Sequence, residues 1–222
     1  GAARRTLALR IKLKATRLAR QTQEALDTAR LLGKHRAFSA DAAQSIVRGL
    51  AIELINSAHD TSQLQQTWLQ LEQLERNMPE LAIQAAQRLV NLGGEPAQAR
   101  TWLLPVWERM VQLPNALPDH HALKLVRALE SGLDTLDAAW LARIESAQLA
   151  NPRDARLQYL AGVACLKRQL WGKAQQLLTQ AIPHLTDAGL RASAWRHLAA
   201  LAERRNDGEA AAEAWKKAAL AH

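Results

Sequence analysis

The side chains of this 222-residue chain that could do chemistry are chiefly seven histidines and one cysteine. Two ligands on one helix face must lie three or four residues apart, and no two of the histidines have that spacing. His120 and His121 are adjacent and would point about 100° apart on a helix. Cys165 fits a small apolar filler of a packed helix. We therefore predict no metal and no resident cofactor on the histidines, which are His35, His59, His120, His121, His184, His197 and His222.

Catalytic arrangements have no better support in the sequence. A single cysteine excludes an internal disulfide framework and any multi-cysteine zinc or iron–sulfur site. Serine, histidine and aspartate occur, but none lies in a strand-to-helix turn that would expose a nucleophile. Gly93 and Gly94 lie between expected helices with no strand before them, so they are not a dinucleotide-binding turn. Asp134 and Asp137 mark a helix start, where carboxylates favour the helix dipole. The chain is predicted not to be an enzyme.

The elements that position these residues are expected to be helices throughout. The chain is 48% hydrophobic and 23% charged, with 10 glycines and 7 prolines, and its Ala, Leu, Gln and Arg favour helix. No apolar run approaches the roughly 20 residues needed to span a bilayer, so the chain is expected to be soluble as given. The start, Gly-Ala-Ala-Arg-Arg, lacks both a Met and the apolar core of a signal peptide, which indicates a trimmed N-terminus.

The net charge of +8 comes from the N-terminal end of the chain. Residues 1–36 hold ten basic side chains and only two acidic ones. Such a patch could attract a membrane or a nucleic acid, but Leu7, Ile11, Ala15 and Leu18 recur at helical spacing, as in an ordinary helix with one solvated charged face. No aromatic residue interleaves these charges, so base stacking has no platform and nucleic-acid binding is disfavoured.

Helical hairpins recur along the chain with a period near 34 residues. In the last one, Trp195 and Leu198 precede a turn at Asn206–Asp207, and Trp215 follows it. Equivalent starts at 45, 80, 121, 155 and 192 are spaced by 35, 41, 34 and 37 residues, and a proline-bounded connector at 113–118 explains the longest interval. A sixth, weaker unit covers Leu9 to Leu32.

This pattern resembles the tetratricopeptide repeat. The fold class is therefore predicted to be all-α, a right-handed superhelix of about six tetratricopeptide-like hairpins. Residues 1–222 are expected to form a single solenoid, with weaker repeats in 1–113 and clearer ones in 119–222. Ser39 and Asp119 are expected to be N-caps. Six tryptophans are expected to be core residues, namely Trp68, Trp102, Trp140, Trp171, Trp195 and Trp215, and Trp107 less so.

The content of these units resembles the C-terminal part of the bacterial HemY proteins. The resemblance lies in the run 68–79, in Gly93–Gly94 with Ala99, and in Trp171–Ala174 and Glu209–Ala212. It is best from about Gln63 onward. HemY proteins are inner-membrane proteins associated with haem biosynthesis, with two N-terminal membrane helices before their repeats. The resemblance implies that those helices lie upstream, that this chain is a soluble fragment at the cytoplasmic face, and that its partner is an enzyme of the haem pathway.

The first helices of successive hairpins are expected to line a concave groove for that partner. The groove would mix basic and apolar side chains and suit an extended or helical acidic peptide, since Arg and Tyr are strong anchors. The predicted binding residues are Gln84, Arg88, Tyr159, Lys167, Arg196 and Arg204, with Leu125, Leu129, Val163 and Ala200 between them.

Three functions remain open at this point. The first is a non-catalytic scaffold for a protein partner. The second is a carrier or chaperone that binds haem or porphyrin between repeats. The third is an adaptor that uses the basic N-terminal helix on a membrane surface or a nucleic acid. The sequence leaves the oligomeric state and the identity of the partner open.

Overall fold

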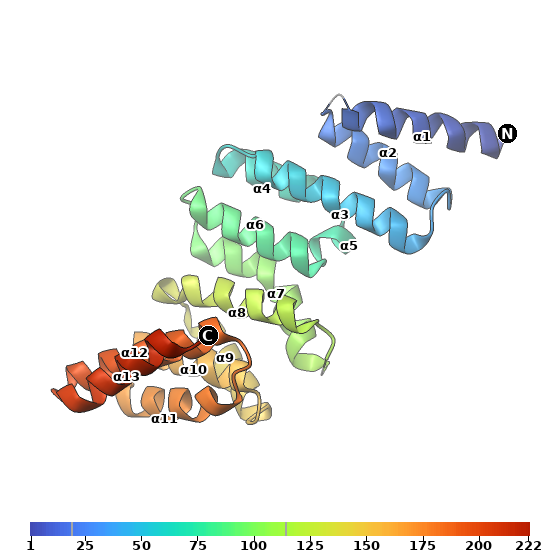
Figure 1. Ribbon diagram of the computed structural model, residues 1–222. Coiled ribbons are helices and arrows are strands. Elements are labelled where there is room, and N and C mark those ends of the chain that lie inside the picture. The colour runs from blue at the N-terminus through green and yellow to red at the C-terminus, as the bar shows by residue number, and fades with distance from the viewer. Residues whose placement is uncertain (19, 114) are drawn as a thin grey trace. The chain divides into compact units, whose positions relative to one another are not determined.

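The computed structural model describes residues 1–18, 20–113 and 115–222, and within these ranges it contains helices and no strand. The predicted all-α class is confirmed. Figure 1 shows the order of the helices. Their bounds are α1 Ala2–Leu18, α2 Thr22–Lys34, α3 Ala40–Ser57, α4 Thr61–Gln70, α5 Gln73–Arg76, α6 Pro79–Asn91, α7 Pro96–Gln112, α8 Asp119–Ser131, η1 Leu133–Thr135, α9 Ala138–Ala150, α10 Ala155–Lys167, α11 Trp171–Ala181, η2 Ile182–His184, α12 Ala188–Arg204 and α13 Gly208–Leu220.

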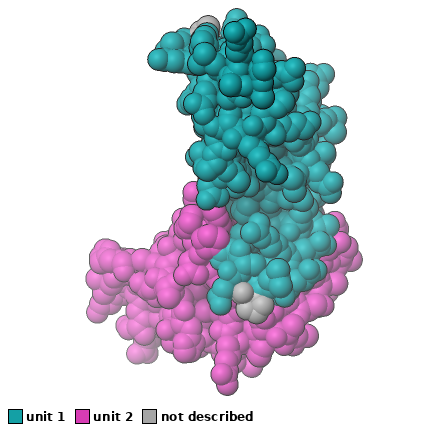
Figure 2. All heavy atoms as spheres, turned by 90° about the vertical axis from the view of Figure 1, so that its right-hand side faces the viewer, with its two compact units in different colours: residues 1–117 teal, residues 118–222 magenta. Residues whose placement is uncertain are grey.

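The chain forms two compact units, residues 1–117 and 118–222, which Figure 2 distinguishes by colour. The boundary falls in the predicted connector at 113–118, of which Pro114 lies outside the described residues. The first unit holds α1 to α7 and the second holds α8 to α13.

Tetratricopeptide-like hairpins build both units. Helices α1 and α2, α6 and α7, α10 and α11, and α12 and α13 pack closely as consecutive pairs. Helix α3 packs on α2 and α6 and touches α4 over a shorter length. Helices α8 and α9 each pack on α10, so the first pair of the second unit is the loosest hairpin.

A repeated tight turn ends five of the helices. In the α10–α11 turn, the Leu170 N–H donates to the Cys165 carbonyl at 2.9 Å and the Gln169 N–H donates to the Leu166 carbonyl at 3.0 Å. These two bonds define a Schellman turn, which needs one residue with positive φ. The same pair of bonds recurs around each residue with positive φ at Arg20, Arg36, Gly93, Gln169 and Asn206.

Aspartate side chains begin many of the helices, which accounts for carboxylates that could otherwise suggest chemistry. Ser39 is an N-cap as predicted, and its Oγ accepts the Ala42 N–H at 3.2 Å. The prediction for Asp119 is wrong, because Pro118 occupies the N-cap and Asp119 is the first helical residue. The N-cap aspartates that accept a backbone N–H are Asp60, Asp137, Asp154, Asp187 and Asp207.

The tryptophan predictions are confirmed only in part. Trp68, Trp102 and Trp140 are buried, and the first two stack with ring centroids 4.7 Å apart. Trp107, expected to be the least certain, is also buried. The remaining three are less covered than predicted, with Trp171 and Trp195 half-buried and Trp215 41% exposed. Trp215 lies on α13, and no later described helix covers the outer side of α13.

Helix α1 packs in a different orientation from the one its sequence suggests. Leu13 and Thr16 are its buried residues, and α2 is the helix it packs against (Figure 1). Leu7, Ile11 and Leu18, expected to form the packed side, are exposed to solvent. None of the described helices combines the length and the apolar character needed to cross a membrane.

Candidate functional site

Helix α10 lies at the centre of the second unit and organises its polar groups. Between Ala155 and Lys167 only Arg156, Leu166 and Lys167 are not buried, because α8, α9, α11 and α12 all pack on this helix. Its apolar residues occur on every side, as expected of a fully surrounded helix. Gly162 permits the closest approach, since a Cβ there would lie 2.9 Å from Leu178 Cγ of α11.

This packing shows that several residues predicted to line the groove are buried instead. Tyr159 was expected on an open face, but its side chain is fully buried. Leu125, Leu129 and Val163, which share that register, are core residues as well. The projection failed because it treated α10 as a helix with one solvated side.

Tyr159 instead joins the first helices of three consecutive pairs. Its hydroxyl lies 2.7 Å from Glu130 Oε1 of α8 and 2.8 Å from Ser193 Oγ of α12. A phenol has one proton, so Tyr159 donates to the stronger acceptor, the Glu130 carboxylate, and accepts the proton of Ser193. His197 Nε2 of α12 approaches the same Glu130 oxygen at 3.4 Å. We call Glu130, Tyr159, Ser193 and His197 the polar cluster.

The environment of Tyr159 raises the pKa of its phenol above the ordinary value. Burial is the main cause, because the charged phenolate would lose its hydration, and the nearby Glu130 carboxylate acts in the same direction. The hydrogen bond from Ser193 and the positive charge of Arg196 oppose the shift but are weaker. Tyr159 therefore stays a neutral donor at physiological pH.

The polar cluster is built for positioning rather than for nucleophilic catalysis. A serine nucleophile needs its proton directed at a base. Ser193 Oγ instead directs its proton at the hydroxyl oxygen of Tyr159. His197 Nε2 faces the Glu130 carboxylate and not Ser193. Neither Glu130 nor His197 was predicted as a member of this cluster. The spacing of Ser193 and His197, four residues apart on one helix, was the available signal.

The remaining predicted residues of the second unit lie near its surface. Arg196 is exposed on α12. Arg204 is exposed as well, and its guanidinium carbon lies 4.0 Å from the centroid of the Trp171 ring. Lys167 Nζ is 2.6 Å from the Asp134 carboxylate, so this cation is paired with the turn after α8.

Gln84 and Arg88 belong to α6 of the first unit, where they hold helices together. Gln84 Nε2 donates to Asn56 Oδ1 at 2.7 Å. A guanidinium nitrogen of Arg88 donates to the Ala58 carbonyl at 2.7 Å. Both contacts fasten α6 to the end of α3.

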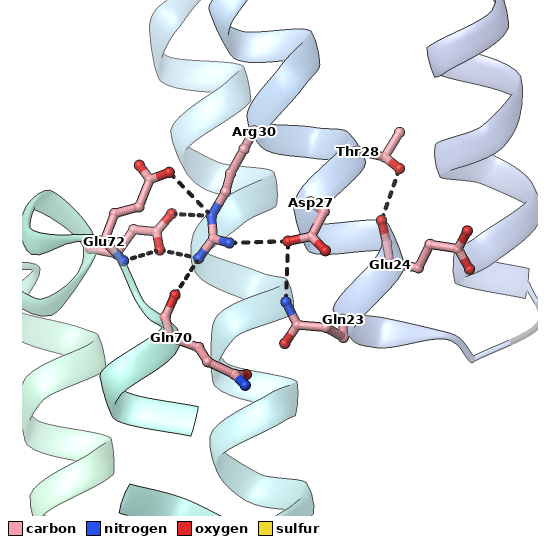
Figure 3. A network of polar contacts seen from close by, with 8 residues as sticks. Gln23, Glu24, Asp27, Thr28, Arg30, Gln70 and Glu72 are labelled. Carbon is pink, nitrogen blue, oxygen red and sulfur yellow. Dashed lines mark hydrogen bonds and ion pairs between the residues drawn. The ribbon is translucent and has the colours of Figure 1, made fainter. Parts of the chain in front are cut away.

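The first unit has a second polar network, centred on Arg30 (Figure 3). The Arg30 guanidinium binds the buried Glu75 carboxylate at 2.9 and 2.5 Å and reaches Asp27 at 3.2 Å. Glu72 lies 3.8 Å from Arg30 Nε. The network links α2 to α5 and borders a cavity of about 610 Å³ between α2, α3 and α5. Because the buried carboxylate is fully paired, this arrangement serves packing.

A second cavity, of about 500 Å³, lies where α8, α10 and α12 begin. Arg156 spans its edge, 3.5 Å from Asp119 and 3.6 Å from Asp154. His120 and His184 also line it. Nevertheless, the described residues contain no group of three or more His, Cys, Asp or Glu side chains that could hold a metal ion.

Comparison with known proteins gives no family for this chain. No protein-family description matches the sequence, and no curated protein does. Two solved structures are similar over most of the chain. "MamA RS-1 ArsTM double mutant" is 18% identical, with 96% of this chain and 92% of that chain covered and a TM-score of 0.41. "MamA 41-end from Desulfovibrio magneticus RS-1" is 19% identical, with 96% and 93% covered and a TM-score of 0.42.

Proposed function

We propose that the protein is a non-catalytic scaffold whose helical hairpins bind a protein partner. The observation that carries this proposal is the exposed pair of cations on α12, Arg196 and Arg204. Eight residues separate them, which corresponds to about 12 Å along a helix. Such a spacing suits two carboxylates of one acidic segment.

The polar cluster supports the proposal because it holds α12 in place. Ser193 and His197 flank Arg196 in sequence, and both contact groups of neighbouring helices. A rigid binding surface loses little conformational entropy when a partner binds. Trp171 restrains Arg204 in a similar way through its ring face, at the near-contact range of a cation–π pair.

The test uses random peptides displayed on phage and selected on the 222-residue chain. We expect acidic peptides to be enriched, with affinities that fall as salt rises. The variant Arg196→Ala with Arg204→Ala should weaken those affinities by about tenfold or more while leaving the helical circular dichroism unchanged, because exposed charges add little stability.

The matched control removes two exposed cations from the second helices of the last two hairpins, α11 and α13, as Lys173→Ala with Lys216→Ala. It should bind the selected peptides as the wild type does. Equal loss in both variants would reduce the effect to net charge, and no loss in the α12 variant would place the binding surface elsewhere.

The finer form of the proposal follows the resemblance to HemY proteins. In this finer form, the partner of the chain is an enzyme of the haem pathway, and the scaffold works at the cytoplasmic face of the bacterial inner membrane. The repeat motifs at 68–79 and Trp171–Ala174 are its support. Purified haem-pathway enzymes, tested one at a time against wild type and the α12 variant, decide between this partner and others.

A further inference from the structure

The outer side of α1 carries an apolar stripe that the fold does not use. Leu7, Ile11 and Leu18 are 59%, 61% and 77% exposed. At 100° per residue, the three side chains lie within about 40° of one another around the helix. The packing of α1 is complete without them, since Leu13 and Thr16 face α2 from the other side. The helix is therefore apolar on two sides, and one of them is unpartnered.

Cations border this stripe on both sides. Arg4 and Lys14 project about 40° to either side of its axis, and both are exposed. Further round the helix, Arg10 and Arg17 lie beyond Lys14, and Arg5 and Lys12 lie beyond Arg4. Residues 1–20 contain seven arginines and lysines and no aspartate or glutamate.

Few of these charges are neutralised by the fold. Lys12 lies 3.4 Å from Glu24. Arg10 donates to the Ala37 carbonyl and stacks 5.1 Å from the centroid of the Phe38 ring, and both of these partners are uncharged. The outer side of α1 thus combines an apolar line with a strong positive potential.

We propose that this side of α1 docks on a membrane surface rich in anionic lipid. A helix of this kind lies in the interface plane, with its apolar side chains at the boundary of headgroups and acyl chains. Long Arg and Lys side chains beside the stripe can extend toward lipid phosphates while their stems stay on the apolar surface.

Charge complementarity favours a bilayer over a protein groove as the occupant. The cations lie on both flanks of the stripe, from Arg4 to Arg17, along about 20 Å of helix. A flat anionic surface meets both flanks at once, whereas a groove would need acidic rims of matching length on each side. The proposal goes beyond partner binding by α12, because it adds a surface in the first unit that positions the scaffold.

The experiment measures co-sedimentation of the 222-residue chain with two kinds of vesicle. One is pure phosphatidylcholine, and the other contains about one third phosphatidylglycerol to supply negative surface potential. We expect binding to the anionic vesicles at least tenfold stronger than to the neutral ones, falling as salt rises.

The decisive variant keeps every cation and removes the stripe: Leu7→Gln with Ile11→Gln and Leu18→Gln. These side chains are exposed, so the helical circular dichroism and the urea midpoint should be unchanged, while vesicle binding falls at least tenfold. The matched control replaces three exposed leucines of other helices, Leu69→Gln, Leu149→Gln and Leu220→Gln, and should bind like the wild type.

Three outcomes overturn the proposal. The first is a wild-type chain that binds neither kind of vesicle. The second is a stripe variant that binds anionic vesicles as strongly as the wild type, which would reduce the interaction to charge alone. The third is a wild type that sediments as a dimer and a stripe variant that is monomeric, which would mean that a second copy covers the stripe.

Discussion

Tyr159 shows how one side chain can connect three helices of the second unit. Its ring fills the core, while its hydroxyl contacts Glu130 of α8 and Ser193 of α12. Loss of the hydroxyl would leave the half-buried Glu130 carboxylate without its shortest hydrogen bond. The pair Tyr159 and Glu130 therefore contributes to stability at neutral pH through a charge-assisted bond.

We expect Tyr159→Phe to lower the free energy of unfolding by about 1–3 kcal/mol at neutral pH, the usual cost of an unsatisfied buried group. Ser193→Ala, which removes the weaker contact, should cost less. Urea unfolding monitored by circular dichroism measures both. A larger loss in Ser193→Ala would contradict the assignment of Glu130 as the main acceptor.

The raised pKa of Tyr159 gives a pH dependence with a defined sign. The folded chain favours the neutral phenol. The contribution of Tyr159 to the free energy of unfolding is therefore complete below about pH 10 and declines as the pH rises further. Because the chain has one tyrosine, tyrosinate absorption reports this group alone. We expect it to appear together with loss of helical signal. Ionisation near pH 10 in a fully helical protein would show that the phenol is accessible.

The roles of individual residues could be predicted from the sequence only in part. The buried cysteine and the N-cap at Asp137 follow from local composition. The position of Tyr159 does not, because it depends on which helices surround α10. The role of His197 does not follow from local composition either, because its contact with Glu130 spans 67 residues.

Individual helices contribute unequally to stability, and the tryptophans make this measurable. Trp102 of α7 is buried and stacks on Trp68 of α4, so its ring holds the α3–α4 segment against α6–α7. Trp215 of α13 is 41% exposed, although its Nε1 donates to Glu203 at 2.7 Å. The two residues offer the same substitution in opposite environments.

We expect Trp102→Ala to lower the free energy of unfolding by about 3–5 kcal/mol, through lost transfer energy and the cavity left behind. Trp215→Ala should cost about 1 kcal/mol or less, as surface changes usually do. The shift of the urea transition measures each. Similar losses in the two variants would contradict the difference in burial.

Hairpin ends could be predicted where the turn residue has a conformational preference. Asn206 and Gly93 favour the positive φ of a Schellman turn, and both turns were located from the sequence. Arg20, Arg36 and Gln169 adopt the same conformation without such a preference. The orientation of α1 was misjudged for a related reason, because a helix with two apolar sides does not indicate which one packs.

For the whole molecule, repeat spacing predicted the class and the position of the connector. The interval of 41 residues pointed to 113–118, where the boundary between the compact units falls. The charge asymmetry was visible as well, since residues 1–36 account for the entire net charge. Which cations are paired needed coordinates, because Lys167 and Arg30 have partners distant in sequence.

Because Cys165 is buried, the rate at which its thiol is labelled reports how often the second unit opens. It is the only thiol of the chain, it is 3% exposed on α10, and burial raises its pKa. A disulfide reagent reacts with the thiolate, so labelling must wait for α10 to become accessible. We expect labelling of the native chain to be much slower than labelling in urea, and Tyr159→Phe to accelerate it by about tenfold for each 1.4 kcal/mol lost. A labelling rate equal to that of the unfolded chain would mean that α10 opens freely. The increase in mass on labelling, followed over time, therefore measures how often residues 118–222 open locally.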